Sequence, residues 1–143
     1  MPLPLTRANI VADARSYVGI RWLHEGRSRS GVDCVGLLCC VGKDFGVKFE
    51  DMKGYSRIPS GFGFMNHLLK YTTINRTNLP QPGSIAMIRG AERASHVGIF
   101  GEIGGRPTLI HANSFAGIVE EKDWQPGVNF ALVRVLDYPG VLD

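Results

Sequence analysis

Three residues whose side chains could together carry out nucleophilic catalysis lie far apart in the sequence: Cys34, His96 and His111. Cys34 follows Asp33 and precedes an apolar run, which predicts that it lies on the first turn of a helix. A helix N-terminus, with a histidine cation nearby, lowers the pKa of a thiol. If Asp33 caps the helix, the backbone N–H of Cys34 stays available to a developing oxyanion. The helix start can thus supply a nucleophile and an oxyanion donor together.

The two histidines are predicted to lie on neighbouring strands. His96 opens one β-favouring segment and His111 ends the next, and Gly104-Gly105 between them is a good hairpin turn. Strand alternation places His96 on the same face as the small Gly98, and His111 could orient the imidazole of His96. A lone buried cysteine is more often structural, but the combination favours a Cys/His/His site. A zinc site from the same residues is less favoured, because the spacing CxxC or HxxxH is absent.

Helices are predicted in the first half of the chain and strands in the second. Apolar residues at helical spacing predict helices over 6–18 and 34–45 and a shorter one over 64–71. The prolines in Leu79-Pro80-Gln81-Pro82-Gly83 end the helical part. Helices followed by strands indicate an α+β fold. Turn residues separate five β-favouring segments, which predict an antiparallel meander: 84–89, 96–100, 107–111, 117–121 and 129–136.

Composition limits the class of protein. With 143 residues, of which 44% are hydrophobic, the chain is expected to form a single domain over 1–143. The formal net charge of +3, without a block of like charges, does not suggest nucleic acid binding. No apolar run approaches the roughly 20 residues of a membrane span, and no signal peptide is recognised, so synthesis in the cytoplasm is expected. The three clustered cysteines are predicted to be free thiols.

The order and wording of these motifs resemble the NlpC-type cell-wall cysteine peptidases, a papain-like family. The resemblance implies N-terminal helices packed on a central antiparallel sheet of about five strands. It also implies Cys34 as nucleophile, His96 as general base and acid, and His111 as the third polar residue. The implied substrate is a peptidoglycan stem peptide, cut between D-glutamate and a diamino acid, with no metal or organic cofactor. The matching segments are Tyr17-Val18-Gly19, Gly31-Val32-Asp33-Cys34-Val35-Gly36-Leu37, residues 79–83, His96-Val97-Gly98-Ile99-Phe100 and Ile110-His111-Ala112.

Two features before the predicted catalytic helix bear on the site. Many relatives have a tyrosine where this chain has Trp22, which offers only an indole N–H. Trp22 is predicted either to replace that hydroxyl at the oxyanion site or, with Asp33, to line the cleft. Arg21, Arg27 and Arg29 could bind the carboxylates of the stem peptide, because arginine pairs well with carboxylates. The alternative is that the three arginines belong to a solvated loop.

Two further segments resemble the phage tail branch of the family: His24-Glu25-Gly26-Arg27-Ser28 and Tyr55-Ser56-Arg57-Ile58-Pro59-Ser60-Gly61. A phage component is carried to the envelope by the virion and needs no signal peptide. The leading hypothesis is therefore a phage-associated peptidoglycan endopeptidase, located in the virion tail with other tail proteins as partners. One alternative is a catalytically silent tail-tip subunit that has a structural or wall-binding role. An acyltransferase or amidase is less favoured, because relatives with lipid substrates often place the histidine before the cysteine.

Overall fold

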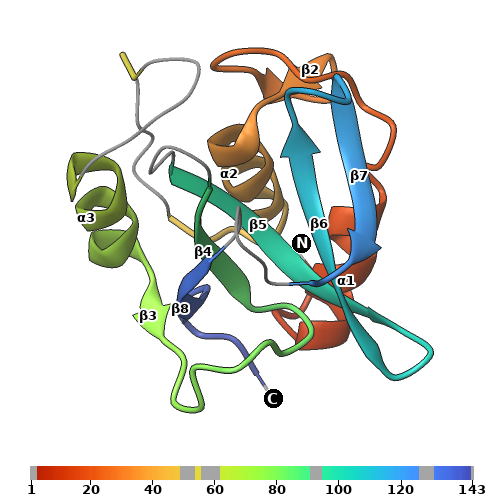
Figure 1. The fold of residues 1–143 in the computed structure, drawn as a ribbon. Coiled ribbons are helices and arrows are strands. Elements are labelled where there is room, and N and C mark those ends of the chain that lie inside the picture. The colour runs from red at the N-terminus through yellow and green to blue at the C-terminus, as the bar shows by residue number, and fades with distance from the viewer. Residues whose placement is uncertain (1–2, 49–53, 56–61, 91–94, 126–130, 143) are drawn as a thin grey trace.

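The computed structural model describes residues 3–48, 54–55, 62–90, 95–125 and 131–142 (Figure 1). Within these residues the helices are α1 (Arg7–Arg15), α2 (Cys34–Asp44) and α3 (Phe62–Tyr71). A small antiparallel hairpin, β1 (Arg27–Ser28) and β2 (Gly31–Val32), leads into α2. The remaining strands form one antiparallel sheet: β3 (Thr73–Ile74), β4 (Ile85–Arg89), β5 (Ser95–Ile103), β6 (Arg106–Asn113), β7 (Ile118–Asp123) and β8 (Ala131–Asp137).

The sheet confirms the predicted α+β class and corrects one detail of its topology. Its strand order is β3-β8-β4-β5-β6-β7, so the meander prediction is correct from β4 to β7 and wrong for the last strand. β8 pairs with β4, in a register that joins Ile85 to Leu136. Four of the five residues of β4 are buried, and a central strand needs backbone partners on both sides. β7 carries the sequence Ile-Val-Glu-Glu-Lys-Asp, and its charged side chains suit the edge of the sheet.

Helix α1 begins as predicted and ends earlier. Thr6 is the N-cap, and its hydroxyl accepts a hydrogen bond from the backbone N–H of Asn9 at 3.1 Å. The helix stops at Arg15, whereas the apolar pattern predicted it to continue to residue 18. Gly19 has a φ of +92°, and its N–H donates to the carbonyl of Val119 on β7 at 2.9 Å. The chain therefore leaves the helix early in order to run beside the sheet.

The main core lies where α1 and α2 meet one face of the sheet. Ile10 of α1 and Leu37 of α2 are fully buried there with Ile99 and Ile110 of the central strands. A smaller cluster on other sheet positions contains Ala86, Ile88, Phe100, Leu109 and Val135. No helix in the described part of the chain is long and apolar enough to cross a bilayer.

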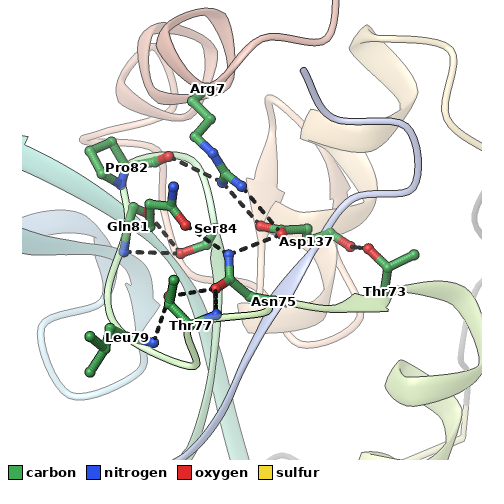
Figure 2. A network of polar contacts seen from close by, with 9 residues as sticks. All are labelled: Arg7, Thr73, Asn75, Thr77, Leu79, Gln81, Pro82, Ser84 and Asp137. Carbon is green, nitrogen blue, oxygen red and sulfur yellow. Dashed lines mark hydrogen bonds and ion pairs between the residues drawn. The ribbon is translucent and has the colours of Figure 1, made fainter. Parts of the chain in front are cut away.

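A polar network that the sequence did not predict joins α1 to the far end of the chain (Figure 2). The Arg7 guanidinium donates to both carboxylate oxygens of Asp137, at 3.0 and 3.3 Å. The amide of Asn75 donates to Asp137 at 3.0 Å and to Gln81 at 2.8 Å, while its oxygen accepts from Thr77. The Arg7 and Asp137 side chains are only 14% and 10% exposed. This network fixes the relative positions of three parts of the chain: helix α1, strand β8 and the segment that follows β3.

Candidate active site

The start of α2 has the predicted arrangement. Asp33 is the N-cap, with extended backbone, and its Oδ1 accepts from the backbone N–H of Gly36 at 2.8 Å. Cys34 is the first residue of the helix and is 6% exposed. All three cysteines are free thiols, as expected.

The environment of the Cys34 thiol differs from the expectation. Burial raises the pKa of this thiol to about 12, and the neighbouring Asp33 carboxylate acts in the same direction. Hydrogen bonds to the sulfur from the backbone N–H groups of Val97, Val35 and Cys34 itself oppose this rise. The donors of the helix start are thus present, but the loss of hydration outweighs them. The thiol is neutral at pH 7 in this structure.

Val97 connects the cysteine to the histidines. Its backbone N–H reaches the Cys34 sulfur, and it directly follows His96 on β5. The N-terminus of α2 therefore lies against the beginning of β5, where His96 is located.

His96 and His111 lie just beyond the end of the β5–β6 ladder, which runs from the pair Ile99 and Ile110 to the hairpin turn. Nε2 of His96 is 2.8 Å from Nδ1 of His111, and the two rings meet edge to face. The predicted neighbouring strands and a contact between the two rings are both present, and the orienting role of His111 stays a prediction. In the described residues, no three His, Cys, Asp or Glu side chains are placed together to hold a metal ion.

Gly98 gives space to the histidine pair, although to a different member than expected. A Cβ at this position would lie 3.1 Å from the Cβ of His111 and 2.9 Å from the carbonyl oxygen of Ile110. The small residue therefore allows β6 to approach β5 at His111, whereas the sequence suggested that it gave reach to His96.

Glu120 is a third member of this chain of contacts and was not among the residues predicted from the sequence. His111 is 2% exposed, and its Nε2 lies 2.9 Å from Oε2 of Glu120. The same oxygen accepts from the Asn113 amide at 3.0 Å and from the Lys122 ammonium at 3.1 Å. His111 and Glu120 face each other directly in the β6–β7 register. That register follows from the turn after Asn113, so the signal was present in the sequence.

Both imidazoles are neutral in this site. Burial lowers the pKa of His96 to about 3, and the nearby His111 and Lys122 act in the same direction. Burial also lowers the pKa of His111, against the hydrogen bond and the charge of Glu120. A neutral thiol and neutral imidazoles therefore form the resting state around pH 7.

Arg27 has a role inside the protein that was not predicted. Its guanidinium donates to Oδ1 of Asp33 at 3.0 Å and to the Tyr55 hydroxyl at 2.8 Å. The Tyr55 hydroxyl in turn donates a short hydrogen bond to Oδ2 of Asp33. The backbone N–H of Glu25 donates to that oxygen as well, at 2.8 Å. Asp33 is thus the centre of a cluster that holds the start of α2, and Tyr55 is a member that the sequence did not indicate.

The other two arginines lie on the exposed loop before α2. Arg29 donates to the backbone carbonyl and the hydroxyl of Ser16, and its guanidinium lies 4.1 Å from the centre of the Tyr17 ring. Arg21 donates to the carbonyl of Ser30 at 3.0 Å. These contacts fit the solvated-loop alternative, and a substrate role for either residue stays a prediction.

Trp22 lies beside the Asp33 cluster. Its backbone N–H donates to the carbonyl of Gly117 at 2.8 Å, and it forms a bridge to Val32 next to the cap. Its ring stacks on His24 with centroids 6.4 Å apart, and His24 meets the Tyr55 ring edge-on at 5.5 Å. The partly buried indole therefore lies next to His24 and the Asp33 cluster, and its part in lining the cleft or in oxyanion binding stays a prediction.

Comparisons with known proteins agree with this architecture. The model of the NlpC/P60 family matches residues 19–134, so the chain belongs to the NlpC/P60 family. The NlpC/P60 domain of the peptidoglycan hydrolase SagA is 26% identical, with a TM-score of 0.54 over 82% of this chain and 88% of that one. No curated protein sequence matches significantly.

Two more distant structures share the fold over 92% of this chain. NlpC2 from Trichomonas vaginalis has a TM-score of 0.69 at 14% identity, and an NlpC/P60 family protein from Bacillus cereus ATCC 10987 has 0.64 at 19%. The chain corresponds to 46% and 40% of those two proteins, so it spans less than half of each.

Proposed function

We propose that this protein is a peptidoglycan endopeptidase that cuts stem peptides by a thiol mechanism. The observation that carries the proposal is the convergence of the Cys34 helix start with the bonded pair His96 and His111. Family membership and the likeness to the hydrolase domain of SagA support a cell-wall substrate.

The resting protonation states define the first chemical step. Because the thiol and the imidazole are both neutral, Cys34 gives its proton to His96 as the sulfur attacks the peptide carbonyl carbon. Nε2 of His96 is engaged by His111, so Nδ1 takes this proton. The backbone N–H of Cys34, which contacts the sulfur in the substrate-free protein, turns to the oxyanion as it forms and stabilises it. The C–N bond then breaks as His96 passes the same proton to the leaving amine, and a thioester remains on Cys34.

Hydrolysis of the thioester completes the cycle. Water attacks the thioester carbonyl and gives a proton to Nδ1 of His96, which acts as general base. The C–S bond breaks, the proton on His96 returns to the Cys34 sulfur, and the product leaves as a carboxylic acid, which loses its own proton to the solvent. His111 holds the His96 ring in position during both steps.

Phage association is the finer part of the proposal. The described portions of the two segments that resemble the phage tail branch contact each other beside Asp33. The Arg27 guanidinium donates to the Tyr55 hydroxyl at 2.8 Å, and the ring of Tyr55 meets that of His24. Residues 56–61 lie outside the described part of the chain. Mass spectrometry of purified virions tests this location, and virions that lack the protein count against it.

The activity is tested by incubating the protein with purified peptidoglycan and identifying the fragments by mass spectrometry. The wild-type protein releases new peptide ends between D-glutamate and the diamino acid, whereas Cys34→Ala and Cys34→Ser release none. Circular dichroism confirms that both variants are folded. Absence of fragments from folded wild-type protein, over several wall types, contradicts the proposed activity.

A catalytically silent subunit is the second candidate, and the burial of the cysteine favours it. The Cys34 side chain is 6% exposed, and its raised pKa keeps it protonated in the substrate-free structure. A silent subunit retains binding to insoluble peptidoglycan in a pull-down but releases no fragments. The same assay therefore separates the two functions.

A further inference from the structure

Glu120 ends the chain of contacts that begins at His96, and its chemistry sets the direction of the hydrogen bonds. Burial acts to raise the pKa of Glu120, but hydrogen bonds from Asn113, Lys122 and His111 outweigh it and hold the pKa below its ordinary value. An ionised carboxylate is acceptor-only. Nε2 of His111, 2.9 Å from Oε2, must therefore carry a proton and donate it.

The rest of the chain follows from this first bond. A neutral imidazole has one N–H, so His111 with its proton on Nε2 leaves Nδ1 as an acceptor. Nδ1 lies 2.8 Å from Nε2 of His96, so Nε2 of His96 must be the donor. Neutral His96 then has no proton on Nδ1, the nitrogen that the proposed mechanism needs as a base. If His111 instead donated from Nδ1 to Nε2 of His96, neutral His96 would already carry its proton on Nδ1.

We propose that Glu120 is a positioning residue that fixes both histidines as their Nε2–H tautomers and so keeps Nδ1 of His96 ready to accept the Cys34 proton. This inference rests on the proposed function for its catalytic consequence. When His96 becomes a cation, the carboxylate also stabilises the positive charge through His111. Among the described residues, the titratable and charged groups around these contacts are His96 on β5, His111 on β6, Lys122 on β7, and Asp33 with Cys34 at the start of α2.

Two substitutions separate the acceptor from the charge. Glu120→Gln keeps an oxygen where three donors converge, so the tautomers persist, while the cation on His96 loses its counter-charge. Glu120→Leu removes the acceptor, so His111 no longer has a fixed proton position. Glu121→Gln is the matched control, because Glu121 is the next residue of β7 and binds Arg15 and Thr108.

The tautomers are measured by nitrogen–proton NMR correlations of the histidine rings, without substrate. We expect Nε2–H on both rings in wild type, Glu120→Gln and Glu121→Gln, and mixed tautomers in Glu120→Leu. With peptidoglycan fragments as substrate, kcat falls about 10- to 100-fold in Glu120→Leu, up to the lower limit of what acid–base catalysis contributes, with KM unchanged. Glu120→Gln loses less, and Glu121→Gln keeps the wild-type kcat.

Two results overturn the inference. One is a proton on Nδ1 of either ring in the wild-type protein, and the other is a folded Glu120→Leu variant with the tautomers and kcat of Glu121→Gln. The NMR result does not depend on activity. A wild-type protein with the expected tautomers that cleaves no peptidoglycan therefore refutes the proposed function and leaves the hydrogen-bond direction established.

Discussion

Two polar networks in this molecule use different chemistry. The network of Arg7, Asp137 and Asn75 joins a two-pronged ion pair to side-chain amides (Figure 2). The network of His96, His111 and Glu120 joins two imidazoles to a carboxylate. A guanidinium stays protonated under all conditions in which proteins fold, so the first network has a fixed hydrogen-bond pattern. An imidazole can give or take a proton at either nitrogen, so the second can change its pattern.

The two networks should therefore affect different properties of the protein. The Arg7 network connects residues from both ends of the chain, so its loss should reduce stability and leave the chemistry intact. The residues of the His96 network lie in the β4–β5 and β6–β7 ladders, whose backbone pairs do not need these side chains, so loss of the side chains should stop the chemistry and leave the fold intact.

The largest expected effect comes from His96→Ala. Loss of the general acid and base should reduce kcat/KM on peptidoglycan fragments by about 10²- to 10⁴-fold. The side chain is shielded from water at the histidine contact, but its residue keeps some exposed surface and belongs to neither apolar cluster, so the melting temperature should stay close to that of the wild type. Steady-state kinetics measures kcat/KM, and calorimetry measures the melting temperature. A variant that unfolds at much lower temperature, with normal kcat/KM while folded, would reverse the roles assigned to the two networks.

Asp137→Ala should give the opposite pattern. It leaves the Arg7 guanidinium, 14% exposed, without its carboxylate, and such a loss typically costs about 3–5 kcal/mol of unfolding free energy. Urea unfolding measures the change, and kcat per folded molecule should be unchanged. Asp123→Ala is the control, because its pair with Arg106 spans 3.7 Å between side chains that are 49% and 72% exposed, and is worth at most about 1 kcal/mol. Equal losses in the two variants would contradict a structural role for the Arg7 network.

Gly98→Ala should reduce both the stability and the catalytic rate. The new methyl group would crowd the Ile110 carbonyl and the Cβ of His111, so we expect a loss of about 1–3 kcal/mol together with a lower kcat. Gly101→Ala is the matched control on the same strand. Its methyl group would lie 2.7 Å from Oγ1 of Thr108 and 2.8 Å from Oε2 of Glu121, away from the histidine contact. It should reduce stability without changing kcat per folded molecule, and a similar kcat loss in both variants would argue against positioning of His111 by Gly98.

The sequence predicted the parts of the site that depend on local patterns. Asp33 and Cys34 precede an apolar run, which marks a helix start. The turn at Gly104-Gly105 makes neighbours of the two strands that carry the histidines. Glu120 was not predicted, although the same hairpin reasoning applies to the next turn. Of the two adjacent glutamates on β7, the register places Glu120 opposite His111 and Glu121 opposite Ile110.

Contacts between distant segments could not be predicted in this way. Tyr55 reaches Asp33 across 22 residues, and Arg7 reaches Asp137 across 130, with no local pattern that pairs them. The position of β8 in the sheet could not be predicted either, since it depends on which buried strand still needs a backbone partner. The pKa of Cys34 is a further case. The helix start was recognised, but the degree of burial that outweighs it is a property of the packed structure.

The smallest predicted effect concerns the reactivity of Cys34, and it separates a neutral resting pair from a preformed ion pair. A raised pKa keeps the proton on sulfur up to about pH 12, so the thiolate fraction should grow about tenfold for each pH unit between pH 6 and 8. Alkylation by iodoacetamide, followed by peptide mass spectrometry, should rise with that slope at Cys34. The more exposed Cys39 should react first at pH 6. A fast, pH-independent reaction of Cys34 over this range would show a thiolate–imidazolium pair, and would mean that the His96 network holds a charge in the resting state as the Arg7 network does.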